Sequence, residues 1–136
     1  MSTTQPIRDQ KKLQIFKNYY KDIKPRPRNH VLIIIGLNTA LRISDILSLT
    51  CQDVYDYEQG CLRTHLTIQE QKTGKNSRIY MNTTIRQTLS ETIKFSVKKK
   101  TACLFESQKD SGMPLSRYQA YRIIREAAES AGLKEH

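Results

Sequence analysis

Hydrophobic residues recur at helical spacing near the beginning of the chain. Leu13, Phe16 and Tyr20 lie three or four positions apart, and lysines fall between them. This pattern predicts an amphipathic helix over residues 9–20, with its apolar side on the core and its lysines in solvent. Residues 24–28 contain two prolines, which end the helix.

The next stretch is apolar almost without interruption. Residues 31–37 hold a single glycine among large aliphatic side chains. We expect a second helix here, capped by Asn29 and continuing to Thr39, and buried at the centre of the core because it is apolar on nearly all sides. Its β-branched residues leave a buried strand as the alternative, but no turn signal appears before Ala40, which favours the helix.

A short third helix is predicted next. Ser44 is placed to cap it, and Ile46, Leu47 and Leu49 supply its apolar side. Residues 56–60 then have the composition of a turn.

Beyond this turn the period of the pattern changes to two. Apolar and polar residues alternate over residues 62–69, which is typical of a half-buried strand, and residues 78–81 form a shorter partner. The two strands flank a segment that contains Gly74. We therefore predict an antiparallel hairpin with Lys72 near its tip.

Two more helices complete the predicted fold. Residues 82–95 carry apolar side chains at every fourth position and a capping box, Thr84 with Gln87. The last helix opens with a second capping box, Ser116 with Gln119. Its apolar face consists of Ile124, Ala127, Ala128 and Ala131, and Gly132 lies where a C-terminal cap is expected. This order of elements predicts a mainly helical α+β domain with a small antiparallel sheet.

The composition indicates one basic domain. The chain has 136 residues, of which 38% are hydrophobic, enough for one core. Lys and Arg number 23 against 13 Asp and Glu, and the formal charge of +10 suits a nucleic acid partner. A solvated basic surface is the alternative. The cations gather near the beginning of the chain and again at Lys98, Lys99 and Lys100, which favours a binding face.

Cysteine usage argues against a disulfide framework or a zinc site. Cys51, Cys61 and Cys103 are odd in number, and none shares a C-x-x-C spacing. The beginning of the chain has no signal pattern, and residues 31–37 are far fewer than the roughly 20 that cross a bilayer. We therefore expect a cytoplasmic protein without a membrane segment, metal or other cofactor.

Arg42 and Lys72 are the candidates for chemistry on a phosphate. The guanidinium of Arg42, which follows the buried helix, suits neutralising charge on phosphate oxygens. Asp45, one turn later, would orient Arg42 or hold the helix start. Lys72 would protonate a leaving hydroxyl once phosphate contact tunes its pKa. The ordinary alternatives are a surface pair of Arg42 with Asp45 and a solvated turn at Lys72.

Four segments, in order, resemble the catalytic domain of tyrosine recombinases, the phage-type integrases. They are residues 36–49, Asp53 with Val54, the hairpin with Lys72, Thr73 and Gly74, and the helix that Leu115 and Ser116 open and that Ala131, Gly132 and Leu133 close. The resemblance implies that Arg42 is the first catalytic arginine, Asp45 its supporting acid and Lys72 the hairpin lysine. It further implies a metal-free reaction in which a tyrosine attacks a DNA phosphate, forms a 3′-phosphotyrosyl link and releases a 5′-hydroxyl.

The same resemblance implies parts that this sequence does not contain. In the family a His-x-x-Arg box, a later His or Trp and the nucleophilic tyrosine follow a segment like residues 131–133, and a clamp domain precedes the catalytic domain. We therefore expect residues 1–136 to form the amino-terminal part of the catalytic domain, without a nucleophile. This chain would bind DNA without cleaving it, as a monomer, although the family acts as a tetramer on DNA.

Double-stranded DNA is the expected partner, and a bacterium, a phage or a mobile element the expected origin. Tyr118 and Tyr121 lie beside arginines in the last helix, as packing or DNA-facing residues, whereas Tyr19 and Tyr20 are expected in the core. The residues expected to contact DNA are Lys75, Arg78, Arg117 and Arg122.

Two other functions remain as alternatives. The first is a basic DNA-binding module or regulatory decoy without catalysis, which would lose affinity with added salt just as a recombinase would. The second is a metal-dependent nuclease or transposase, which needs clustered carboxylates. Asp45, Asp53 and Asp56 are close in sequence, yet each has a local explanation as a helix or turn residue.

Overall fold

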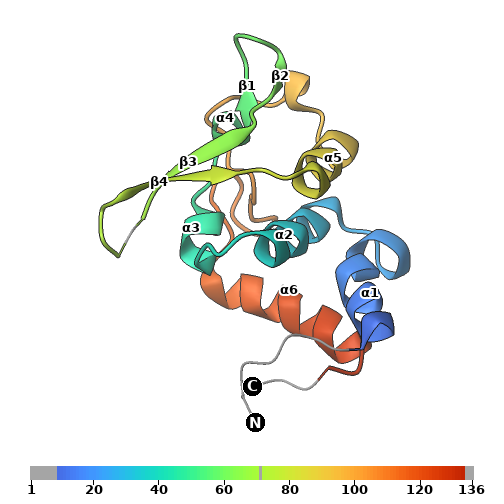
Figure 1. Cartoon of the computed structure of the whole chain (residues 1–136). Coiled ribbons are helices and arrows are strands. Elements are labelled where there is room, and N and C mark those ends of the chain that lie inside the picture. Colours follow the sequence, from blue (N-terminus) through green and yellow to red (C-terminus); the bar gives the residue numbers. More distant parts are fainter. Residues whose placement is uncertain (1–8, 71, 134–136) are drawn as a thin grey trace.

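The structure is a computed structural model that describes residues 9–70 and 72–133 (Figure 1). Its helical elements are α1 (Gln10–Asn18), the π-helix η1 (Tyr19–Ile23), α2 (Pro27–Asn38), α3 (Ile43–Leu47), α4 (Cys51–Val54), α5 (Thr83–Thr92), the 3-10 helix η2 (Phe95–Val97) and α6 (Arg117–Ser130). The strands are β1 (Tyr55–Asp56), β2 (Cys61–Leu62), β3 (His65–Gln69) and β4 (Asn76–Tyr80). The predicted α+β class is confirmed, but the described residues form two antiparallel hairpins rather than one.

The first helix forms as predicted and then continues as a π-turn. Asp9 caps α1 by accepting hydrogen bonds from the backbone N–H groups of Lys11 and Lys12. The π-helix η1 follows directly, so the helical path extends beyond residue 20. Tyr20 is 2% exposed and its hydroxyl donates to the carbonyl of Ile123 at 2.7 Å, which confirms its predicted core position.

Helix α2 runs through the middle of the molecule and packs on α1, η1, α3 and α5 (Figure 1). Every residue from 31 to 35 is at most 3% exposed, so this part of the helix is buried all round, whereas Leu37 near its end is 43% exposed. The backbone is helical from Pro27 to Asn38, so the strand alternative is wrong. The predicted cap, Asn29, is also wrong: α2 starts at Pro27, with Arg26 as N-cap. Proline suits the first helical position because its φ is fixed and its missing N–H is not needed there.

Helix α3 starts two residues earlier than predicted. Arg42 is its N-cap residue, so Ser44 lies inside the helix and does not cap it. The helix ends at Leu47, and Leu49 lies beyond it but is still 2% exposed. The short helix α4 was not predicted.

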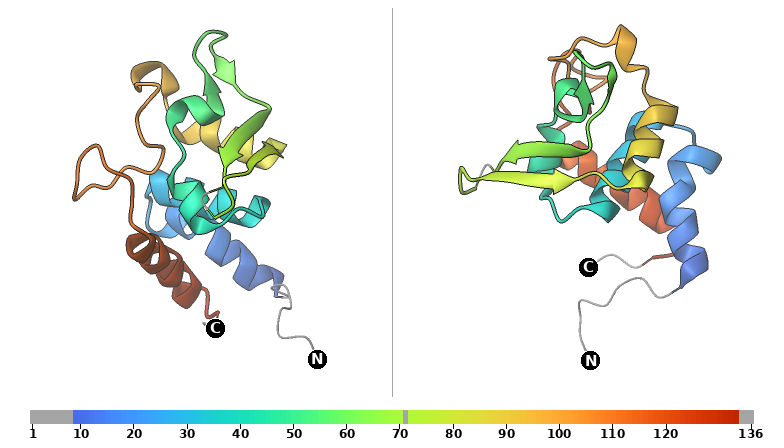
Figure 2. Two further views of the ribbon diagram at one scale, coloured as in Figure 1. Left: turned by 90° about the vertical axis from the view of Figure 1, so that its left-hand side faces the viewer. Right: turned by 45° about the horizontal axis from the view of Figure 1, so that its top comes forward.

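The β3–β4 hairpin projects from the helical body (Figures 1 and 2). The predicted strand over residues 62–69 is divided, because β2 ends at Leu62 and pairs with β1, whereas β3 begins at His65. Strand β3 pairs with β4 from His65 opposite Tyr80 to Gln69 opposite Asn76. Its inward side chains, Leu66 and Ile68, are 0% and 4% exposed, as the alternation predicted.

The two later helices differ in how well their starts were predicted. Helix α5 is capped by Asn82, whose side chain accepts from the backbone N–H of Ile85 at 2.9 Å, so the predicted cap Thr84 is wrong. The capping box of Ser116 with Gln119 in α6 is confirmed. Gly132 has a φ of 72°, as expected for a glycine that closes a helix.

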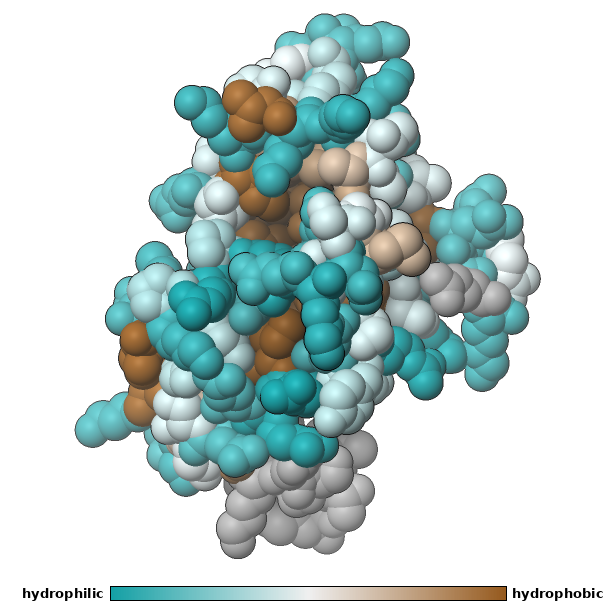
Figure 3. Space-filling view, turned by 180° about the vertical axis from the view of Figure 1, so that it is seen from behind, coloured by the Kyte–Doolittle hydropathy of each residue, from teal (hydrophilic) through white to brown (hydrophobic). Residues whose placement is uncertain are grey.

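The core lies between α2, α5, the inner face of β3 and the loop before α6. Helix α6 crosses beneath α2 and α3 and lies beside α1 (Figure 1). Seen from behind, the surface is mainly hydrophilic, and hydrophobic side chains show in a hollow in the upper half, near the centre and as separate projections at the upper left and lower left (Figure 3). None of the described helices is both long and apolar enough to cross a membrane.

Candidate active site and DNA-facing surface

Arg42 lies at the junction between α2 and α3, with a fixed backbone and an exposed side chain. Its carbonyl oxygen accepts hydrogen bonds from the N–H groups of Asp45 and Ile46, both at 3.0 Å. Just before it, the hydroxyl of Thr39 donates to the carbonyl of Ile35 at 2.9 Å and ties the junction to the buried helix. The guanidinium of Arg42 therefore extends into solvent, while the backbone that carries it is held in place by the core.

Asp45 lies in the first turn of α3 and is only 2% exposed. The carboxylate is therefore buried, whereas the side chain of Arg42 is exposed. Its burial next to the N-terminus of α3 suits a residue that holds the helix start beneath Arg42.

Lys72 is exposed on the turn that connects β3 and β4. Glu70 shapes this turn from its base: its carbonyl accepts from the N–H of Gly74 at 2.7 Å. Its carboxylate accepts from the hydroxyls of Ser77 at 2.7 Å and Thr73 at 3.2 Å. Gly74 has a φ of 71°, which glycine adopts without strain. Glu70 thus stabilises the turn that carries Lys72 through hydrogen bonds to residues on the far side of the turn, Thr73, Gly74 and Ser77.

Glu70 also connects the hairpin electrostatically to Arg42. The hydrogen bonds from Ser77 and Thr73 are the main causes that lower the pKa of Glu70, and the charges of Lys75 and Arg42 lower it further. Arg42 therefore lies within electrostatic reach of the hairpin base.

The other hairpin cations lie on different sides. Lys75 is exposed in the turn, where its charge acts on Glu70. Arg78 is exposed in β4 opposite Thr67, so it points to the face of the hairpin opposite from Ser77 and Glu70. Arg78 and Ser77 therefore project from opposite faces of the hairpin.

Helix α6 presents the remaining predicted DNA contacts. Arg117 is its first residue, and Arg122 lies one and a half turns later; both are exposed. The Arg122 guanidinium lies 5.8 Å from the centre of the Tyr118 ring. Tyr118 and Tyr121 are 71% and 51% exposed, so they belong to the surface and not to the core.

The carboxylates of the metal-dependent alternative have structural roles. Asp53 closes a capping box at α4, where it accepts from the N–H of Thr50 at 2.8 Å. Asp56 accepts from the N–H groups of Glu58 and Gln59 in the turn between β1 and β2. Within residues 9–70 and 72–133, no three acidic, histidine or cysteine side chains are grouped in a way that could hold a metal ion.

Sequence reasoning missed Glu70 and the asparagine pair that joins α2 to α5. Asn82 donates its amide to the side-chain oxygen of Asn38 at 2.9 Å, across 44 positions of sequence. No local pattern indicates such a pair. Glu70 had a usable signal, since Thr73 and Ser77 follow it at the spacing of a hydroxyl-braced turn.

Comparison with known proteins adds the decisive observation. The model of the phage integrase family matches residues 6–136, nearly the whole chain. The chain belongs to the phage integrase family. It is 40% identical over 135 residues to the probable integrase/recombinase YoeC of Bacillus subtilis, and 31% identical over 109 residues to the type 1 fimbriae regulatory protein FimE of Escherichia coli K12.

This integrase is shorter than the proteins it matches. It spans 68% of YoeC and 52% of FimE. Its fold superimposes on XerA recombinase with a TM-score of 0.69 at 17% identity, covering 97% of this chain and 46% of XerA. A lambda integrase tetramer bound to a Holliday junction gives a TM-score of 0.64 at 16% identity, covering 97% of this chain and 37% of the other. These likenesses confirm the fold expected from the family resemblance, that of the amino-terminal part of a recombinase catalytic domain.

Proposed function

We propose that this chain supplies part of the active site of a tyrosine recombinase, which cleaves and rejoins DNA at specific sites through a 3′-phosphotyrosine. Arg42 would bind the non-bridging oxygens of the scissile phosphate, Asp45 would support its helix, and Lys72 would protonate the departing 5′ oxygen. The observation that carries the proposal is the match of residues 6–136 to the phage integrase family. Within it, Arg42 is exposed at the N-cap of α3 and Lys72 is exposed on the β3–β4 turn.

The chemistry requires both cations at one phosphate. Negative charge builds on the non-bridging oxygens as the tyrosine attacks, and a guanidinium stabilises it through two parallel hydrogen bonds. The leaving oxygen needs a proton, and an ammonium group in contact with the phosphate can deliver it. These two roles explain why Arg42 is fixed beside the core and Lys72 is held on a turn.

DNA is the proposed partner, contacted by Lys75, Arg78, Arg117 and Arg122. The proposal is supported by the charge of +10, by the exposure of all four side chains, and by the likeness to lambda integrase, a protein whose tetramer is bound to a Holliday junction. We propose that the 136-residue chain alone is a cytoplasmic monomer of bacterial, phage or mobile-element origin that binds DNA without cleaving it.

The test uses Arg42→Ala in the protein completed with a carboxy-terminal segment that supplies the tyrosine. The covalent complex between protein and a nicked duplex should form with the native residue and fall by about 100-fold or more in the variant, of the order seen when one stabilising donor is removed. The reaction should continue in excess EDTA. An unchanged yield in the variant would contradict the role of Arg42, and no covalent complex with the native residue would favour the non-catalytic DNA-binding module. Loss of the reaction in EDTA would favour the metal-dependent nuclease.

A further inference from the structure

A second cationic surface lies in a pocket between the first turn of α2, helix α6 and the loop that precedes α6. The pocket has a volume of about 530 Å³, and neither Arg42 nor Lys72 lines it. Glu126 is the one carboxylate among the described residues that line it. The cations that line it are Lys24, Arg26, Arg28, Lys109 and Arg122.

The carboxylate of Glu126 already has hydrogen-bond partners within the protein. Glu126 accepts from the ammonium of Lys24 at 2.8 Å and from the hydroxyl of Tyr19 at 2.7 Å. These hydrogen bonds lower the pKa of Glu126 and neutralise Lys24. The other four cations form no ion pair with any residue in the described part of the chain. The pocket therefore keeps a positive charge that the protein itself does not compensate.

Arg28 is half-buried and held only by neutral acceptors. Its Nε donates to the amide oxygen of Asn29 at 2.9 Å, and its Nη1 donates to the carbonyl of Glu106 at 3.0 Å. Burial is the main cause that lowers the pKa of Arg28, and the charge of Arg26 acts in the same direction. A partly buried guanidinium without a counter-ion is stabilised by an anion.

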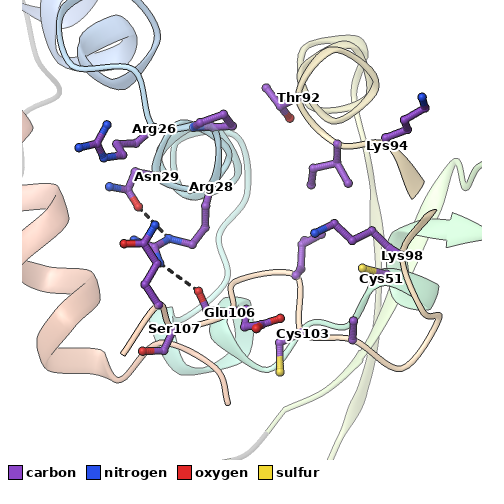
Figure 4. A pocket seen from close by; sticks show the side chains of 15 residues that line it. Arg26, Arg28, Asn29, Cys51, Thr92, Lys94, Lys98, Cys103, Glu106 and Ser107 are labelled. Carbon is purple, nitrogen blue, oxygen red and sulfur yellow. Dashed lines mark hydrogen bonds between the residues drawn. The ribbon is translucent and has the colours of Figure 1, made fainter. Parts of the chain in front are cut away.

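The first turn of α2 adds backbone N–H donors to the pocket. No side chain caps this 12-residue helix, and its first residue, Pro27, has no N–H. The backbone N–H groups of Arg28 and Asn29 and the positive dipole end of the helix are therefore available to an anion. Asn29 lines the pocket, is only 6% exposed, and uses its oxygen for Arg28. Its amide nitrogen has no hydrogen-bond partner in the described part of the protein. Figure 4 shows Arg26, Arg28 and Asn29 together, with Lys94 and Lys98 across the neighbouring cavity.

We propose that this pocket binds a phosphate group of the DNA backbone, beside the contacts made by α6. The inference rests on the proposed DNA-binding function. Arg122 carries the connection, because it lines the pocket and also lies over Tyr118 on the exposed side of α6. A free phosphate compound is the other source of the same chemistry, and the experiment separates the two.

The experiment compares two double variants of this chain, each of which removes two positive charges. R26A/K109A changes the pocket, and K99A/K100A changes exposed lysines that line neither this pocket nor the neighbouring cavity. Duplex affinity is measured by fluorescence anisotropy over a range of salt concentrations, and thermal unfolding confirms that both variants fold. The pocket variant should bind at least about tenfold more weakly, and its salt slope should fall by about 0.9 for each phosphate that it no longer neutralises. The control variant should change both quantities much less.

Each other outcome has a defined meaning. Equal weakening in both double variants would overturn the pocket in favour of general charge attraction. An unchanged R26A/K109A alongside a weakened Arg117→Ala would overturn the pocket while leaving the proposed function standing. No duplex binding by the native chain would overturn the DNA-binding proposal itself. If inorganic phosphate shifts the NMR amide signals of Asn29 while R26A/K109A binds DNA normally, the ligand is a free phosphate and the DNA source is wrong.

Discussion

At the scale of single residues, polar side chains decide where helices begin, and several compete for each position. Ser116 was predicted correctly because its partner Gln119 is local. Thr84 was wrong because Asn82, two residues earlier, both caps α5 and binds Asn38 at the end of α2. A cap that also makes a distant contact prevails over one that offers only a local bond, and sequence spacing does not show the distant contact.

Asn82→Ala should therefore destabilise the chain much more than Thr84→Ala. The first change removes a helix cap and a hydrogen bond to Asn38, which together contribute about 2 kcal/mol. Thr84 is exposed, so its removal should change the free energy of unfolding by less than about 0.5 kcal/mol. Urea unfolding of the two variants measures the difference, and equal effects would contradict the role assigned to Asn82.

At the scale of elements, the long periodic segments were predictable, and most of the short ones were not. The pattern identified α1, α2, α5, α6, the β3–β4 hairpin and, among the short elements, α3. It missed α4 and the β1–β2 hairpin, whose strands have two residues each. Such short elements depend on contacts remote in sequence, as when the N–H of Cys51 donates to the carbonyl of Ala102 at 2.9 Å. Likewise the family motif pointed to Arg42 and Lys72, whereas the hydrogen bonds of Glu70 to Thr73 and Ser77 became visible in the fold.

The hairpin that carries Lys72 should lose part of its stability in acid. The folded pKa of Glu70 is lowered from 4.5, so its ionised form stabilises the fold above that pH, and this contribution is lost as the pH falls through the lowered value. Glu70→Gln should therefore melt at a lower temperature than the native chain at pH 7. Below about pH 4 the gap should shrink, and a gap that stays constant with pH would rule out the charge as its cause.

At the scale of the whole molecule, the excess positive charge is arranged on more than one face. The hairpin and α6 carry the four cations assigned to DNA, and the exposed lysines at positions 98–100 lie elsewhere in the chain. Net charge explains attraction to DNA, but only the placement of the cations explains which face binds.

Two double variants test that placement. R117A/R122A should reduce the slope of log affinity against log salt by about 0.9 for each phosphate that the two arginines neutralise. K99A/K100A removes the same charge from exposed positions and should change the slope much less. Anisotropy titrations with a duplex give both slopes, and a larger change in the lysine variant would place the DNA face away from α6.

The central claim is that Arg42 and Lys72 act on one phosphate in different ways. The most direct test replaces the bridging 5′ oxygen of the DNA by sulfur, which leaves without a proton, in the protein completed with its nucleophile. Lys72→Ala should cleave ordinary DNA about 10²- to 10⁴-fold more slowly than the native protein but cleave the sulfur substrate at nearly the native rate. Arg42→Ala should stay slow on both substrates. Equal impairment of Lys72→Ala on the two substrates would contradict its role as the proton donor.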